Sequence, residues 1–196
     1  MYGRPYTNVW LVPLTRQDWI RAGRSALEEG GPAKVAVSPL AQAIGATRGS
    51  FYWHFDDRSD LLRAVLADWE RRTTDGTIEA VLSEPDPGER LLRLFTLVLA
   101  DPSAPVLDVT IAAHADDPIV GPILERVTQR RVEFVETCFT DLGFGAEAPA
   151  RARIAYAAFV GWLQLRHIAP ALTSGAENDG RVIAALIARV LRNDLA

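Results

Sequence analysis

Helix start and stop signals recur along the sequence, and they constrain the fold more than any other feature. Residues with capping side chains precede a proline in Ser38-Pro39, Asp86-Pro87 and Asp117-Pro118. Between such signals, apolar residues recur at three- and four-residue spacing, and no stretch alternates convincingly with period two. A chain of 196 residues is long enough to bury a core without disulfides. We therefore predict an all-α fold of about nine helices.

The expected helices differ in length. Three near the N-terminus cover residues 15–30, 38–45 and 47–54, with Ser38 as the N-cap of the second. A fourth follows Asp57 and continues to about residue 82, where Gly76 allows a bend. Further helices begin near residues 87, 104 and 118, and the last two cover residues 148–169 and the segment after Asn178.

Residues 40–55 carry the strongest local signal. Two short helices are joined at Gly45, where a left-handed backbone conformation costs glycine little. Helical spacing gives an inward stripe of Leu40, Ile44, Phe51 and Phe55 and an outward face of Arg48, Gly49, Tyr52 and Trp53. This pattern is typical of a helix-turn-helix, in which a small core holds the recognition helix from behind and leaves its front free.

The outward face has the chemistry that DNA binding needs. Thr47 and Arg48 lie at a helix N-terminus, which attracts phosphate, and Gly49 has no side chain to hold the helix away from the groove. Tyr52 can donate to phosphate, and Trp53 can contact sugar or a thymine methyl group. The alternative is a helical hairpin whose aromatic residues pack on the rest of the molecule.

Residues 15–63 resemble the DNA-binding domain of the tetracycline-repressor-like (TetR) family. The matching residues are Ser38, Ala41, Ile44-Gly45, the run from Thr47 to Phe55, Arg58 and Leu61-Leu62. The resemblance implies a homodimer of Ω-like outline, whose larger C-terminal domain holds a ligand pocket and dimerises through its last two long helices. It divides the chain into a tail (1–14), a helix-turn-helix domain (15–58) and a ligand-binding and dimerisation domain (59–196).

Residues that would contact DNA are carried over from the same resemblance. They are Ser38, Thr47, Arg48, Gly49, Ser50, Tyr52, Trp53, His54 and Arg58. The sequence departs from the family at residues 33–37, where a threonine is common. Lys34 in this segment either supplies a phosphate contact instead or is simply solvated.

The pocket is expected among the middle helices. Candidate lining residues lie on apolar helical stripes and are Trp69, Phe95, Ile111, His114, Phe134, Cys138, Phe159 and Trp162. Each of them also fits an ordinary core, and His114 fits a core histidine as well as a polar pocket group. Together they suit an apolar or aromatic ligand.

Surplus apolar surface near the C-terminus indicates a dimer. Residues 154–165 are apolar nearly all round, so that helix must be covered on more than one side, and Ala157, Ala158 and Gly161 permit close approach. The expected interface comprises Tyr156, Val160, Leu163, Ile183, Leu186, Ile187 and Val190. The alternative is that both helices are buried within one monomer.

The net charge of −4 seems at first to argue against a nucleic-acid partner. However, residues 1–55 contain six basic and three acidic residues, whereas the remaining residues contain 15 basic and 22 acidic ones. This split favours a basic DNA-binding part and an acidic regulatory part. One cysteine excludes an internal disulfide, and neither a metal nor a cofactor is expected. The sequence has neither a signal peptide nor a membrane-spanning stretch, so we expect a cytoplasmic protein without membrane contact.

These observations favour a ligand-responsive transcriptional regulator that is not an enzyme. We expect a repressor that binds a palindromic double-stranded operator as a homodimer and is released by an unknown small, largely apolar effector. The alternative is an all-helical small-molecule enzyme or binding protein in which the helical hairpin is only structural.

Overall fold

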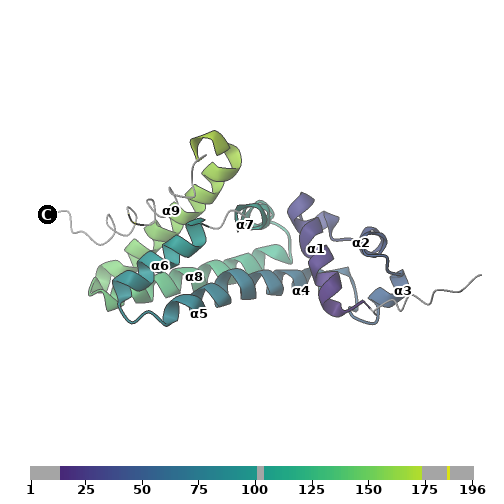
Figure 1. Ribbon diagram of the computed structural model, residues 1–196, viewed down its shortest axis with the longest axis horizontal. Coiled ribbons are helices and arrows are strands. Elements are labelled where there is room, and N and C mark those ends of the chain that lie inside the picture. Colours follow the sequence, from purple (N-terminus) through teal and green to yellow (C-terminus); the bar gives the residue numbers. More distant parts are fainter. Residues whose placement is uncertain (1–13, 101–103, 174–184, 186–196) are drawn as a thin grey trace, which may run out of the picture.

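A computed structural model describes residues 14–100, 104–173 and 185 of the chain. Within these ranges the structure is helical and contains no strand, which confirms the predicted all-α fold. A small head at one end of the molecule is formed by α1 (Arg16–Gly30), α2 (Val37–Ala43) and α3 (Arg48–Phe51) (Figure 1). The larger body contains α4 (Arg58–Glu70), α5 (Gly76–Leu82), α6 (Pro87–Ala100), α7 (Ala104–Ala112), α8 (Val120–Asp141) and α9 (Ala148–Ile168).

Helix α1 begins with the acidic capping signal that the sequence contains. The Asp18 N–H donates to Thr15 Oγ1 over 3.3 Å, and the Thr15 N–H donates back to Asp18 Oδ2 over 2.7 Å. The hydrogen bonds from the Thr15 hydroxyl and backbone, together with the one from Arg21, lower the pKa of Asp18 to about 2. Asp18 is therefore ionised at neutral pH, where its charge suits the helix N-terminus.

Two predicted boundaries in the head are wrong. Helix α2 begins at Val37 with Ala36 as its N-cap, because the Leu40 N–H already donates to the Ala36 carbonyl over 3.1 Å. Ser38 is therefore inside the first turn and makes no capping hydrogen bond. Helix α3 ends at Phe51, and residues 52–54 form a turn in which the His54 N–H donates to the Phe51 carbonyl over 2.9 Å.

The predicted long helix over residues 58–82 is interrupted by a π-helical turn at Arg71–Asp75, between α4 and α5. Figure 1 shows α4 and α5 as one rod that runs along the base of the body and reaches the head. If α4 and α5 are counted as one helix, as predicted, the described residues contain eight α-helices. The sequence predicts about nine helices for the whole chain. The segment after Asn178, predicted to be the last helix, lies outside the described residues.

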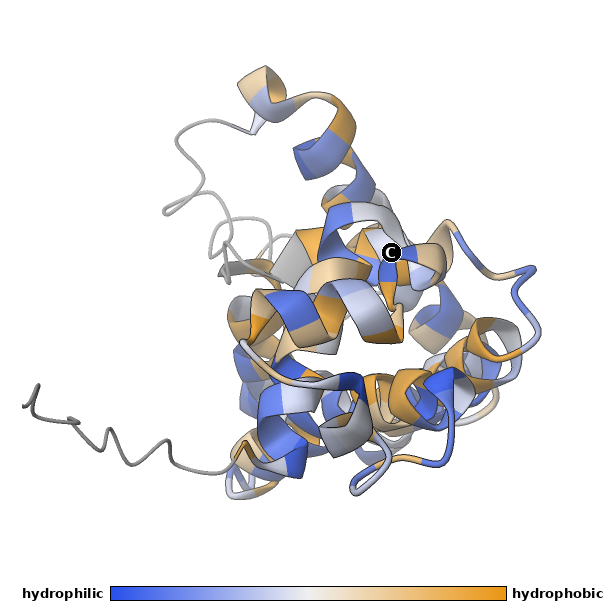
Figure 2. Cartoon of the chain, turned by 90° about the vertical axis from the view of Figure 1, so that its right-hand side faces the viewer, coloured by the Kyte–Doolittle hydropathy of each residue, from blue (hydrophilic) through white to orange (hydrophobic). Residues whose placement is uncertain are grey.

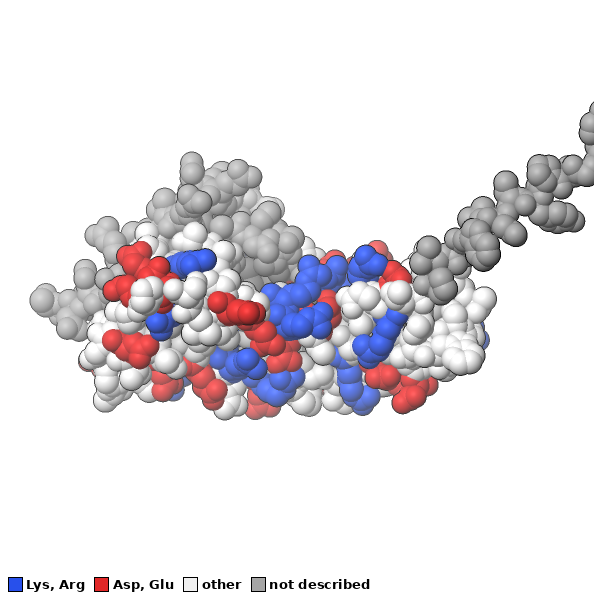
Figure 3. All heavy atoms as spheres, turned by 60° about the horizontal axis from the view of Figure 1, so that its bottom comes forward, with Lys and Arg blue, Asp and Glu red and all other residues white. Residues whose placement is uncertain are grey.

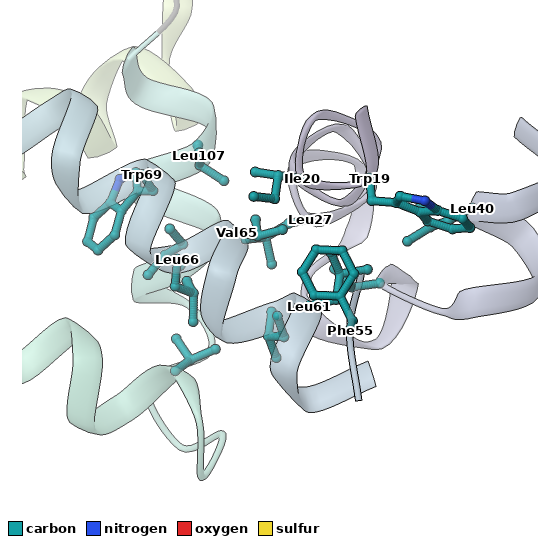
Figure 4. Close-up of a cluster of buried hydrophobic side chains, with 14 of the residues drawn as sticks. Trp19, Ile20, Leu27, Leu40, Phe55, Leu61, Val65, Leu66, Trp69 and Leu107 are labelled. Atoms are coloured by element: carbon teal, nitrogen blue, oxygen red, sulfur yellow. The ribbon is translucent and has the colours of Figure 1, made fainter. Parts of the chain in front are cut away.

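Two hydrophobic clusters stabilise the molecule. The first contains residues of all three head helices, of α4, of α7 and of the start of α8, and Figure 4 shows Trp19, Phe55, Leu61, Trp69 and Leu107 among its members. The second lies in the body between α5, α6, α8 and α9. Figure 2, which views the molecule from the head end, shows hydrophobic and hydrophilic residues mixed along each helix, as expected for helices with one buried side. The first core therefore extends beyond residue 58, where the sequence suggested a domain boundary.

Helix α7 packs against α1 and so connects the body with the head. At this contact Gly31 follows α1 with φ +78° and ψ −172°, a conformation nearly closed to other residues. A Cβ atom added to Gly31 would lie 2.3 Å from Cε1 of His114. His114 Nδ1 lies 2.8 Å from the carbonyl oxygen of Thr110, which orients the ring. His114 therefore lies at the head–body contact, a position that fits the core alternative for this residue.

Candidate functional site

The outward face of the head is built on one buried aromatic residue. Phe51 is 0% exposed, stacks on Phe55 at 5.5 Å between ring centroids, and contacts Trp19 edge-on at 5.2 Å. Because Phe51 points inward, the next two residues of the chain point out: Tyr52 is 58% exposed and Trp53 is 87% exposed. Large aromatic side chains left this open are typical of a binding surface.

Local hydrogen bonds order the start of α3. Thr47 is its N-cap, and its Oγ1 accepts from the Ser50 N–H over 3.1 Å, while Ser50 Oγ donates to the Thr47 carbonyl over 2.8 Å. Ser50 is half-buried. The predicted DNA contacts that are exposed are Lys34, Ser38, Thr47, Arg48, Gly49, Tyr52 and Trp53. We call these seven exposed residues the head face.

Two predicted DNA contacts are instead engaged inside the head. His54 is half-buried, and its Nε2 lies 3.0 Å from the carbonyl oxygen of Leu14. The Arg58 guanidinium donates from Nε to the Val35 carbonyl over 2.7 Å and from Nη2 to the Pro32 carbonyl. Both side chains therefore hold chain segments in place behind the head face, and the prediction that they contact DNA is not supported by their positions.

Basic side chains also gather where the head meets the body. Figure 3 shows arginine and lysine residues over the middle of the underside of the molecule. They surround two buried carboxylates of α4: Asp68 pairs with Arg24, Arg71 and Arg72, and Glu70 pairs with Arg126. The Glu70 hydrogen bonds raise the pKa of Arg126 above its ordinary value, which favours the charged guanidinium. These ion pairs tie α4 to α1 on one side and to α8 on the other.

The body contains a cavity that is bordered by the π turn and by α5, α6, α8 and α9. The cavity has a volume of about 50 Å³ and opens to solvent. The lining residues are Thr73, Thr74, Thr77, Ile78, Leu94, Phe95, Val98, Arg131, Phe134, Val135, Tyr156 and Phe159. The predicted pocket residues Phe95, Phe134 and Phe159 are among them, and so is Tyr156, which was predicted for the dimer interface.

The other predicted pocket residues lie elsewhere. Trp69 and Ile111 are buried in the first core, Cys138 is buried in the second, and Trp162 packs against that second core. Burial raises the pKa of the Cys138 thiol, which keeps it protonated and unreactive. An apolar stripe identifies the inward side of a helix, but it does not indicate which inward residues border empty space.

Sequence reasoning missed the polar part of the cavity. Three threonines of one helical turn, Thr73, Thr74 and Thr77, line it together with Arg131 of α8. The available signal was the group of three hydroxyl residues within five positions of a helix that is otherwise amphipathic. The π turn at Arg71–Asp75 contains two of these threonines, and such turns are frequent at functional sites.

Helix α9 carries an exposed apolar face. We call the exposed residues Ile154, Val160, Leu165 and Ile168 the α9 face. Leu163, predicted for the interface, is only 3% exposed and packs inside the second core. The remaining predicted interface residues, Ile183, Leu186, Ile187 and Val190, lie outside the described residues.

Within residues 14–100, 104–173 and 185, no three residues of the metal-binding types His, Cys, Asp and Glu come together as a potential ion site. None of the helices in the same ranges is long and apolar enough to cross a membrane.

Sequence comparison relates the head to known regulators. Residues 20–65 match the profile of "Bacterial regulatory proteins, tetR family". The chain is 35% identical over 93 residues to the HTH-type transcriptional regulator TtgR of Pseudomonas putida, which covers 44% of either protein. It is 32% identical over 86 residues to AcrR of Shigella flexneri, covering 43% of this chain and 39% of that one. The matches thus span less than half the length of these relatives.

Structural comparison extends the likeness of the fold to the body. A transcriptional regulator from Rhodococcus has a TM-score of 0.73 at 17% identity and covers 92% of this chain and 100% of its own. Reduced NemR of Escherichia coli has a TM-score of 0.72 at 18% identity, covering 88% and 96%. FadR of Bacillus subtilis, solved with stearoyl-CoA, has a TM-score of 0.70 at 12% identity, covering 93% and 100%. The head thus matches the profile of the tetR family of bacterial regulatory proteins over residues 20–65, and the chain as a whole shares its fold with these solved regulators.

Proposed function

We propose that the protein is a transcriptional repressor that binds a palindromic operator as a homodimer and is released by a small molecule. The observation that carries the proposal is the head face, where Tyr52 and Trp53 stand exposed beside the N-terminus of α3 because Phe51 is anchored behind them. In a dimer, two such faces would enter successive major grooves about 34–36 Å apart. Relatives named as operon repressors support the direction of regulation.

The proposal is tested by measuring binding of the wild-type protein to DNA from either side of its own gene. Fluorescence anisotropy should give binding that weakens steeply as salt rises, because phosphate contacts release counterions. Footprinting should give a protected site with two-fold symmetry. If no fragment from this region is bound more tightly than random DNA, the repressor proposal is wrong, and the enzyme or binding-protein alternative is favoured.

The homodimer part of the proposal rests on the α9 face. Exposed Ile154, Leu165 and Ile168 lie along a helix that also exposes the small residues Ala157 and Gly161. Such a face suits close packing against a second copy around a two-fold axis. A charged side chain introduced on this face would be buried in the dimer without a partner, which is costly.

Replacing both Ile154 and Leu165 by glutamate is expected to weaken dimerisation by about 100-fold or more. Size-exclusion chromatography with light scattering should give the mass of two chains for the wild type and of one chain for the variant. Leu82→Glu is the matched control, because Leu82 is an equally exposed apolar residue at the end of α5. A double variant that stays dimeric would contradict the assignment of this face.

The effector part of the proposal rests on the cavity. It borders the π turn of the rod formed by α4 and α5, and α4 shares the first core with the head. A ligand can shift the protein between DNA-binding and released states only through different affinities for the two. The binding of stearoyl-CoA by FadR of B. subtilis supports an apolar effector for a protein of this fold.

A further inference from the structure

Arg131 of α8 lies at the boundary between the cavity and an adjoining open groove. Thr73, Thr77, Val98, Arg131 and Phe159 line both spaces. Beyond these shared residues the groove includes the charged residues Arg72 and Asp108 together with Gly76, Ala80 and Leu97, whereas the cavity is lined by aromatic residues of α6, α8 and α9. A molecule that spans both spaces would therefore meet charged groups at one end and aromatic rings at the other.

The Arg131 guanidinium is held in one position but not saturated. It donates from Nε to Thr74 Oγ1 and from Nη2 to Thr73 Oγ1, each over 2.8 Å, and from Nη1 to Asp108 Oδ1 over 2.9 Å. It also lies over the ring of Trp69, 5.0 Å from the centroid. A guanidinium has five N–H groups, so two remain without a partner in the described part of the chain. Hydrogen bonds from a guanidinium to a carboxylate are charge-assisted and therefore strong.

Asp108 of α7 is the counter-ion that a carboxylate ligand would compete with. Its Oδ1 accepts from Arg131, and its Oδ2 accepts from Trp69 Nε1 over 3.2 Å. The side chains of Arg131 and Asp108 are only 13% and 10% exposed, so their charges are weakly screened. Arg72 also lines the groove, but it already pairs with Asp68 over 4.0 Å. The preference for an anion therefore rests on Arg131.

Resting on the repressor function proposed above, we propose that the effector is an amphipathic monoanion with a carboxylate on an aromatic or branched apolar body. The carboxylate binds Arg131 in place of Asp108, and the apolar body lies where the groove opens into the cavity, beside Val98 and Phe159. Displacing Asp108 removes an ion pair between α7 and α8. Because α7 also packs on α1, the loss of this ion pair is transmitted through α7 to the head.

Calorimetric titration with two probes of the same shape tests the charge preference. 1-Naphthylacetate carries the carboxylate, and 1-naphthylacetamide replaces it with a neutral amide. Wild-type protein should bind the acid at least about tenfold more tightly, because a hydrogen bond to a charged group is worth more than a neutral one. Arg131→Gln should weaken binding of the acid by about 10- to 100-fold and change binding of the amide by less than about threefold.

Two further variants sharpen the test. Asp108→Asn should tighten binding of the acid, because the competing carboxylate is gone, so it has the opposite sign to Arg131→Gln. Arg130→Gln is the matched control: Arg130 is the neighbouring arginine, pairs with Asp75 over 3.0 Å and lies outside the cavity lining. It should leave both affinities unchanged. Arg131→Lys, which keeps the charge, serves if the glutamine variant does not fold, and should weaken binding of the acid less than tenfold.

The proposal is overturned if acid and amide bind equally, if neither binds at millimolar concentration, or if Arg131→Gln weakens both alike. DNA binding by the same proteins is measured separately, without probe. A wild-type protein that prefers the acid but binds no DNA would contradict the repressor function and leave the ligand class standing. A protein that binds DNA but does not prefer the acid would contradict the ligand class and leave the repressor function standing.

Discussion

Replacing Arg48 and Tyr52 together by alanine is expected to lower affinity for operator DNA by about 100-fold or more at about 150 mM salt. Arg48 is exposed at the start of α3, and Tyr52 is 58% exposed one turn later, so both reach outward from the same side of the head. In a dimer each substitution acts in both subunits, which doubles its effect on the binding free energy. Fluorescence anisotropy on the fragment that the wild type binds gives the affinity directly.

A salt titration separates the two residues. Log affinity falls with log salt, and Arg48→Ala alone should make this fall shallower, by about 1 in slope for each phosphate that Arg48 neutralises in the wild type. Tyr52→Ala should leave the slope nearly unchanged. Arg93→Ala is the control, because it removes an equally exposed positive charge from α6 in the body. Circular dichroism should be the same for all variants. Equal decreases in affinity for the head and body variants would mean that the head face does not bind DNA.

Gly31→Ala is expected to destabilise the protein by about 2–4 kcal/mol, measured as the free energy of unfolding in urea. Two effects add at this residue. Its φ of +78° and ψ of −172° strain any side chain, and the new Cβ would lie 2.3 Å from Cε1 of His114. Because His114 is in the segment that follows α7 and Gly31 follows α1, the clash would push the head away from the body.

Gly45→Ala separates strain from the clash. Gly45 also has a positive φ, +68°, but no atom lies within 4 Å of the Cβ it would gain. It should cost only about 1 kcal/mol. The double variant Gly31→Ala, His114→Ala should recover the part of the destabilisation that comes from the clash, since it removes the imidazole that the methyl group meets. If the double variant is no more stable than the sum of the two single changes predicts, the packing of His114 on Gly31 is not what fixes the head.

Helix starts could be predicted because their hydrogen bonds are local. Asp57 accepts from the Asp60 N–H and Asp86 from the Glu89 N–H, each over 2.8 Å, and the sequence identifies both as caps. Partners three residues apart are visible in a linear pattern. The start of α2 was misplaced because Ser38-Pro39 looks like a cap, while the extended backbone at Ala36 lets the helix begin two residues earlier.

Some of the candidate DNA contacts could be placed from local spacing, and others could not. Tyr52 and Trp53 lie on the outside as predicted, because the spacing of the chain puts them on the opposite side from buried Phe51 and Phe55. The positions of His54 and Arg58 could not be predicted, because their partners Leu14, Pro32 and Val35 are 23 to 40 residues away in sequence. Both side chains are polar and near the recognition helix, and only the folded chain brings distant carbonyl groups within reach of them.

The sequence by itself determined the helical class, the caps at Asp57 and Asp86 and the outward face of the head, since each follows from spacing over one or two helical turns. Only the tertiary structure decided where empty space remains, that Tyr156 borders it and that Trp69 does not, and that Arg131 meets Asp108 between two spaces. A cavity is what is left when four helices fail to fill the volume between them. Its position depends on the packing of all of them at once and on the π turn that redirects Thr73 and Thr74, and no local pattern contains that information.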